Sequence, residues 1–85
     1  MPTISMFYGI IVEIRYDDHN PPHIHAEYGE YEASFDFDGN IIKGSFPPKK
    51  TKLIAAWAEI HSDELEANWK LVKSNKQPFP IDPLK

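Results

Sequence analysis

The sequence predicts an α+β domain: a four-stranded antiparallel meander sheet followed by one long or two shorter C-terminal helices packed on one face. Two observations predict it. Up to residue 45, apolar and polar residues alternate with the period of two that is typical of strands with one buried face. After Pro47-Pro48, apolar residues recur every three or four positions, which is typical of amphipathic helices. Strands followed by helices are typical of the α+β class.

The first predicted strand covers residues 4–16, where every even position is apolar. These positions hold Ile4, Met6, Tyr8, Ile10, Val12, Ile14 and Tyr16. Near the end of this run, Glu13 and Arg15 mark the other face as polar. We therefore expect the even positions to face the core and the odd positions to face solvent.

Three more strands are predicted at residues 23–28, 31–38 and 41–45, with turns at Gly29-Glu30 and Asp38-Gly39. A two-residue turn at Gly29-Glu30 pairs Tyr28 with Tyr31 and fixes the register of every pair behind it. The other expected pairs are Ala26 with Ala33 and Ile24 with Phe35 on the apolar face, and Glu27 with Glu32, His25 with Ser34 and His23 with Asp36 on the polar face.

This register collects polar side chains on one side of the sheet, which we call the wet face. Its predicted members are Glu13, Arg15, His23, His25, Glu27, Glu32, Ser34 and Asp36. Three of the four histidines of the chain lie within residues 19–25, on either side of the strand-breaking Pro21-Pro22. Since histidine titrates near neutrality and is the commonest metal ligand, the wet face is the first place to look for chemistry.

The helical pattern runs over residues 47–74. Asp63 with Glu66 resembles a capping box, so two helices joined near His61-Ser62 and one long helix are both open alternatives. His61 falls on the apolar side and is expected to be a hydrogen-bonded core histidine, whereas Asn68 is considered as a partner contact. We expect residues 1–75 to form a single domain and residues 76–85, with three prolines, to form an extended tail.

Composition narrows the function classes. The chain has 85 residues, enough for one small core, and no cysteine, which excludes disulfides and thiolate metal sites. Its net charge of −4 argues against sequence-independent binding to nucleic acid, which depends on attraction to phosphates. Without a signal-peptide pattern or an apolar run long enough for a membrane span, a cytoplasmic protein with no membrane partner is expected.

Several motifs carry a resemblance to one family. They are Met1-Pro2-Thr3-Ile4-Ser5, Phe7-Tyr8-Gly9, the block from Asp17 to Ala26, Tyr28-Gly29-Glu30-Tyr31, and the segment from Trp57 to Trp69. Together they resemble a widespread family of small bacterial proteins known as domain of unknown function 4160. Members of such families often lie beside a second small gene, in an arrangement that resembles toxin-antitoxin modules. The resemblance therefore implies a small protein partner encoded nearby and no defined reaction.

Two functions follow as hypotheses. The first is a protein-partner-binding component of a toxin-antitoxin-like or regulatory gene pair. The second is a His-dependent ribonuclease or other hydrolase, metal-free or metal-assisted. In a metal-free enzyme, Asp36 would orient His23, with His25 beside it and Arg15 to steady a phosphate. The simplest interpretation of these residues is a solvated sheet face with ordinary cross-strand pairs.

Two further sites are considered. His19, His23, His25 and Glu27 would supply ligands for a divalent metal such as zinc, although the spacing lacks any diagnostic zinc pattern and no cofactor is otherwise expected. A basic group near the helix start, which includes Lys43, Lys49, Lys50 and Lys52, would bind phosphate or RNA, or simply form a solvated edge. Lys49-Lys50 stands where the resembled family prefers arginines, and this weakens bidentate phosphate binding there.

Overall fold

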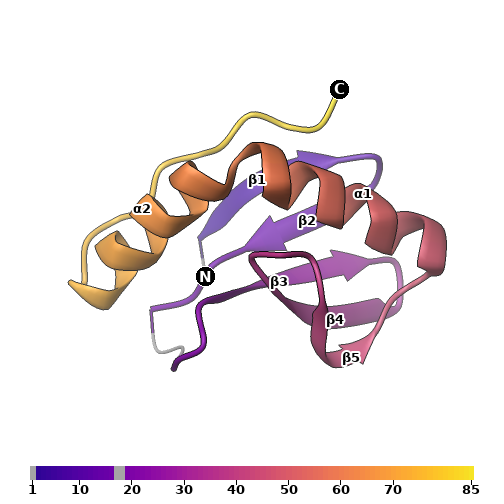
Figure 1. The fold of residues 1–85 in the computed structure, drawn as a ribbon, viewed down its shortest axis with the longest axis horizontal. Helices are drawn as coiled ribbons and strands as arrows, with labels where there is room; N and C mark the ends of the chain where they lie inside the picture. The colour runs from indigo at the N-terminus through magenta and orange to yellow at the C-terminus, as the bar shows by residue number, and fades with distance from the viewer. Residues whose placement is uncertain (1, 17–18) are drawn as a thin grey trace.

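The computed structural model describes residues 2–16 and 19–85, and its architecture confirms the α+β class (Figure 1). Five antiparallel strands form one sheet in the order of the chain, and two helices follow. The elements are β1 (Thr3–Phe7), β2 (Ile10–Glu13), β3 (His23–Tyr28), β4 (Tyr31–Asp36), β5 (Ile41–Ser45), α1 (Pro48–Ile60) and α2 (Ser62–Lys73). The meander is therefore correct in topology, but it has one strand more than the four predicted.

The additional strand arises because the predicted strand at residues 4–16 folds into a hairpin. Tyr8 and Gly9 both adopt positive φ, 49° and 79°, as a two-residue hairpin turn of the favoured kind requires. Phe7 then pairs with Ile10, so odd positions before the turn share a face with even positions after it. Met6 and Tyr8, expected in the core, are consequently 62% and 54% exposed.

A bulge at the start of β1 returns Ile4 to the core. Thr3 pairs with Glu13 but Ser5 already pairs with Val12, so Ile4 is the extra residue on its strand. Ile4 is buried, as is Phe7 at the other end of β1. A simple alternation rule cannot describe this strand, because the bulge and the turn each change which residues face inward.

The register between β3 and β4 matches the predicted register at all six pairs, from His23 with Asp36 to Tyr28 with Tyr31. The apolar partners of these strands are buried: Ile24, Ala26, Ala33 and Phe35. The sheet therefore has the expected two faces in this region, with the core on one side and the wet face on the other.

The helical region consists of two helices, which settles the alternative left open by the sequence. Both lie over the apolar face of the sheet (Figure 1), with Ile54, Trp57, Leu65 and Trp69 among their buried residues. The break falls at His61, where the two-helix alternative places it, but not through a capping box, since this N-cap residue of α2 makes no side-chain capping hydrogen bond. No helix in the described part of the chain is long and apolar enough to cross a membrane.

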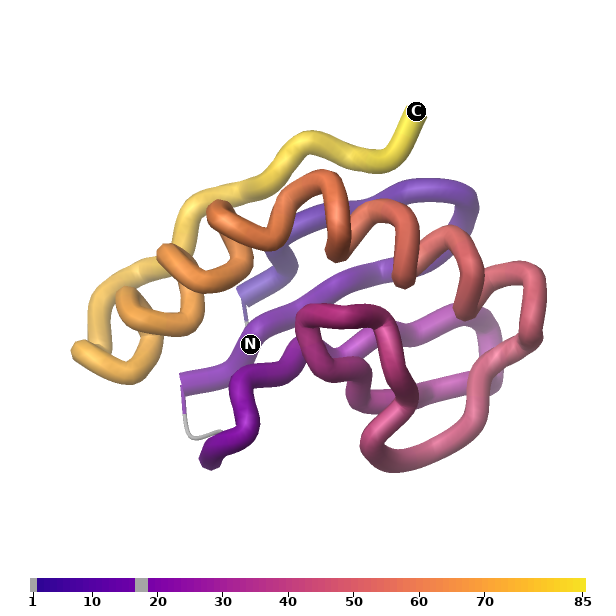
Figure 2. The backbone as a smooth tube through the Cα atoms, viewed as in Figure 1, coloured from indigo at the N-terminus to yellow at the C-terminus, as the bar shows by residue number. Residues whose placement is uncertain are grey.

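Residues 76–85 run back along β1 and the helices (Figure 2). The backbone N–H of Ile81 donates to the carbonyl of Ile4 at 2.7 Å, and the indole Nε1 of Trp57 donates to the carbonyl of Asp82 at 2.8 Å. Ile81 is only 3% exposed. The tail therefore covers the outer edge of β1, while β5 forms the opposite edge of the sheet.

Candidate functional site

A row of polar residues crosses the wet face from β2 to β5. Glu13 pairs with His25, His25 with Ser34, and Ser34 with Lys43. Within this row the Oγ of Ser34 lies 3.2 Å from the Nδ1 of His25, within hydrogen-bonding distance. The sheet thus places Ser34 between His25, its predicted partner, and Lys43, which the sequence groups with the lysines of the helix start.

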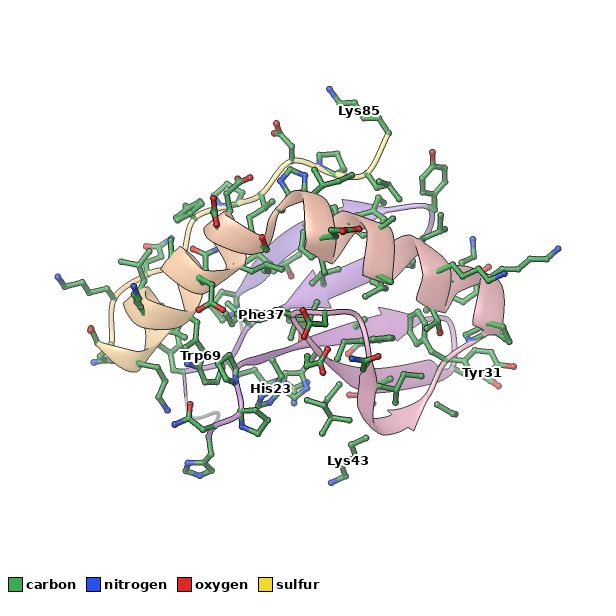
Figure 3. All side chains as sticks on the ribbon, viewed as in Figure 1. His23, Tyr31, Phe37, Lys43, Trp69 and Lys85 are labelled. Carbon is green, nitrogen blue, oxygen red and sulfur yellow. The ribbon has the colours of Figure 1, made fainter. Side chains whose placement is uncertain are left out.

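His23 lies at the end of the sheet where β3 begins, close to α2 (Figure 3). Its ring centroid is 5.0 Å from that of His25 and 5.6 Å from that of Trp69. Its Nδ1 lies 2.7 Å from the carbonyl oxygen of Pro21, within hydrogen-bonding distance. The two histidines are therefore neighbours, and His23 is held by contacts to the Pro-Pro loop and to a helix.

Asp36 stabilises the turn between β4 and β5. One carboxylate oxygen accepts hydrogen bonds from the backbone N–H groups of Asp38 and Asn40 at 3.0 and 2.9 Å, and the other accepts one from the side chain of Asn40 at 3.2 Å. Burial alone raises the pKa of Asp36, but the hydrogen bonds from Asn40, Asp38 and Gly39 outweigh it, so the net pKa lies below its ordinary value of 3.8. The structure therefore gives Asp36 a turn-forming role.

Replacing Asp36 with alanine is expected to lower the free energy of unfolding at neutral pH by about 1 kcal/mol, because these turn hydrogen bonds are lost. Since the folded-state pKa is depressed, this stabilisation is present above about pH 4 and disappears as pH falls through the folded pKa. The difference between wild type and variant in urea unfolding should therefore shrink in acid. Asp38→Ala, an exposed carboxylate of the same turn, is the matched control. An equal pH dependence for both variants would contradict this role.

Arg15 lies between two carboxylates at the wet face. Its Nη2 is 3.5 Å from Oε1 of Glu13 and 3.7 Å from Oε1 of Glu32. Both distances exceed the range of a normal hydrogen bond. Within the described residues, the buried Nε of Arg15 and the buried Oε1 of Glu13 have no hydrogen-bond partner. The guanidinium is thus positioned by charge but not saturated by hydrogen bonds.

A hollow of about 310 Å³ opens beside this group. Its lining comes from three strands and the segment after β2: Arg15, His25, Glu32, Ala33, Ser34, Lys43 and Gly44. The hollow therefore joins the predicted catalytic residues Arg15 and His25 to Lys43, and neither His23 nor Asp36 lines it. Of the four catalytic candidates, the structure brings two into one cavity.

The predicted metal ligands are His19, His23, His25 and Glu27. His23 and His25 are adjacent, Glu27 follows on the same strand, and His19 lies exposed in the loop before it. Across residues 2–16 and 19–85, no three histidine, aspartate or glutamate side chains converge as a metal site would require. Asp17 and Asp18, which open the histidine-rich motif, lie outside the described residues. The metal site stays a prediction.

The four lysines do not line one common site. Lys43 lies on β5 and lines the hollow, whereas Lys49, Lys50 and Lys52 lie on α1 and do not line it. The Nζ of Lys50 donates to the carbonyl of Tyr8 at 3.3 Å and sits 4.8 Å from the ring centroid of Tyr28. Lys50 therefore packs on the end of the sheet.

Sequence reasoning missed the role of Asn68. It was considered as a partner contact, but it is fully buried. Its Nδ2 donates to the carbonyl of Phe79 at 2.8 Å, and its Oδ1 accepts from the N–H of Phe79 at 2.9 Å. The sequence feature that indicates its burial is its position on the apolar stripe of the helix, three residues after Leu65. The nearby His61, expected to be hydrogen-bonded, has its Nδ1 2.6 Å from Oε1 of Glu64.

Comparison with known proteins gives one result. A family model described as a domain of unknown function (DUF4160) matches residues 9–70, more than half of the chain. No curated protein and no solved structure matches the chain significantly. The matched segment contains the whole wet-face row and the hollow beside it, while β1 and the tail that covers it lie outside the match.

Proposed function

The chain belongs to the DUF4160 family, and we propose that it is a cytoplasmic protein-binding module whose β5 edge pairs with an extended segment of a second protein. The second protein is the other member of a toxin-antitoxin-like or regulatory gene pair. The observation that carries this proposal is the difference between the two edges of the sheet.

One edge is covered and the other is open. The tail lies along β1 and hydrogen-bonds to Ile4, but in the part of the chain that the structure describes, β5 pairs only with β4. All five residues of β5 are exposed, and Ile41 and Ile42 are 41% and 46% exposed. An exposed strand edge offers unpaired backbone N–H and C=O groups, which is how many domains bind an extended peptide.

The charge at the centre of β5 favours a different protein over a second copy of this chain. If two copies paired antiparallel about the middle of β5, Lys43 would lie directly opposite Lys43, and like charges in that position are destabilising. A partner segment with an acidic or neutral residue opposite Lys43 avoids this repulsion. The bulge at Ile42 further restricts which strands can pair here.

The alternative, a His-dependent ribonuclease or other hydrolase, needs His23 and Asp36 to act together. Both oxygens of Asp36 accept hydrogen bonds within the turn, and Nδ1 of His23 is within hydrogen-bonding distance of Pro21. These contacts give both residues a structural role. The edge of β5 has no comparable structural use, so partner binding is the function that the geometry supports better.

Ile42→Lys tests the proposal. Lysine at this position removes an exposed apolar side chain from the edge and adds a second positive charge beside Lys43, so this variant is expected to weaken binding to the protein encoded by the adjacent gene by about tenfold or more. Binding is measured by titration calorimetry after co-expression has shown that the two proteins form a complex. Because Ile42 is already half exposed, the thermal unfolding midpoint should change little.

Ile60→Lys is the matched control, since Ile60 is 66% exposed but lies at the end of α1. It introduces the same charge and removes the same side chain away from the edge, and it should bind like the wild type. Equal affinity of the wild type and Ile42→Lys, or equal losses for both variants, would exclude β5 as the binding surface.

A further inference from the structure

We propose that the hollow beside Arg15 and Lys43 binds the phosphate group of a phosphate monoester. This site is distinct from the backbone edge of β5, and it does not depend on a protein partner. Two cations reach the hollow from different parts of the chain, Arg15 after β2 and Lys43 on β5. The cross-strand register joins Lys43 to Ser34, Ser34 to His25 and His25 to Glu13, and Arg15 contacts Glu13, so both cations belong to one continuous polar surface.

The contacts of the Arg15 guanidinium favour an oxyanion as the ligand of the hollow. The Nη2 atom of its guanidinium lies 3.5 Å from Glu13 and 3.7 Å from Glu32. These contacts orient the group, yet they are too long to count as good hydrogen bonds. A guanidinium that is oriented in advance loses less freedom when it binds, and its planar fork matches the oxygen spacing of a phosphate or carboxylate.

The lining favours phosphate over carboxylate. Arg15 and Lys43 can each take a different oxygen of a tetrahedral group, and Ser34, which pairs with Lys43, lines the same hollow. The hydrogen bond between Ser34 and His25 at 3.2 Å fixes the position of the serine hydroxyl. Gly44 adds no side chain at the rim. The volume of about 310 Å³ lies at the lower end of small-ligand sites, so it leaves room for the organic part of a phosphate monoester.

The carboxylate of Glu32 at the rim limits how much negative charge the hollow accepts. Its side chain is 63% exposed, so solvent screens it, whereas the Glu13 side chain is only 12% exposed and is compensated by Arg15. The two cations Arg15 and Lys43 therefore stand against two carboxylates, Glu13 beside Arg15 and the screened Glu32 at the rim, in a chain whose net charge is −4. A single phosphate fits this balance better than a polyanion.

The test is titration of the isolated, isotope-labelled protein with inorganic phosphate, followed by amide and arginine Nε–H NMR signals. Saturable shifts are expected at Arg15, Ser34, Lys43 and Gly44. Lys43→Gln should weaken binding about tenfold, because one charge-assisted contact is lost. Lys49→Gln, an exposed lysine on α1, should bind like the wild type. Arg15→Lys keeps the positive charge but loses the planar guanidinium with its paired N–H donors, so this variant should also bind phosphate more weakly.

Two more probes separate the sources of the phosphate. Adenosine monophosphate binding more tightly than inorganic phosphate would indicate a nucleotide, and a 5′-phosphorylated RNA oligonucleotide binding more tightly than its 5′-hydroxyl form would indicate an RNA end. Absence of saturation with all these probes would overturn the proposal. So would equal affinity for acetate, or unchanged phosphate affinity in a folded Lys43→Gln. The partner-binding titration of Ile42→Lys is a separate experiment, so either proposal can fail alone.

Discussion

Asn68→Leu is expected to release the C-terminal tail and to lower the free energy of unfolding by about 2–4 kcal/mol. The side chain of Asn68 acts like a strand partner, since it both donates to and accepts from the backbone of Phe79. Leucine has a similar volume but offers neither group, so the backbone N–H and carbonyl of Phe79 lose both of these partners. Urea unfolding measures the loss of stability. Hydrogen exchange at the amides of Phe79 and Ile81 measures the release, because both amides donate to the body of the protein.

Glu66→Leu is the control for this change. Glu66 lies on the exposed side of the same helix, so the substitution adds the same side chain without touching the tail. It should change stability by less than about 0.5 kcal/mol. Continued protection of the Ile81 amide in Asn68→Leu would show that Ile81 and Trp57 hold the tail without Asn68.

The contrast between the two hairpins shows what the sequence can predict. Gly29-Glu30 is a two-residue turn with glycine in the first position, and the alternation on either side of it agrees, so the register of β3 and β4 was predicted at every pair. In the first hairpin, Tyr8 adopts a positive φ of 49°, which is uncommon for a tyrosine and is therefore not indicated by the sequence. The even positions there remain apolar through the turn, so the pattern looked like one strand.

The candidate site was also predicted only in part, because local sequence patterns do not show every contact between strands. Arg15 was placed beside the histidine row because face matching required it. Lys43 was assigned to the lysines of the helix start because it is close to them in sequence, whereas cross-strand pairing places it beside Ser34. The turn role of Asp36 had a readable signal, since an aspartate two residues before Asp38-Gly39 is typical of an Asx turn. The burial of Asn68 is indicated by its place on the apolar stripe of the helix, but its partner Phe79 lies in a separate segment, so no local pattern indicates that contact.

Gly44→Ala is expected to detach β5 from β4 and to cost about 3 kcal/mol or more of stability. Gly44 has a φ of +87°, and a Cβ there would lie 2.3 Å from the backbone oxygen of Glu32 and 3.0 Å from the Cα of Ala33. Since both are backbone atoms of the paired strand, only separation of the strands relieves the clash. Denaturant unfolding and the amide protection of β5 measure the effect.

Gly29→Ala is the control for Gly44→Ala, because it introduces the backbone strain of a positive φ without a steric clash. Gly29 also has a positive φ, +57°, but a Cβ there would meet nothing within 4 Å. This variant should lower the free energy of unfolding by only about 1–2 kcal/mol, because alanine is strained in the left-handed conformation. If the two variants are equally destabilised, strain alone accounts for Gly44 and the close approach of β4 is unimportant. If Gly44→Ala is the more destabilised, the close approach of β4 to Gly44 accounts for the difference.

The binding properties of Gly44→Ala should follow from the detachment of β5. Because β5 provides both the proposed binding edge and Lys43, this variant should lose partner binding and phosphate binding together, whereas Ile42→Lys should lose only partner binding.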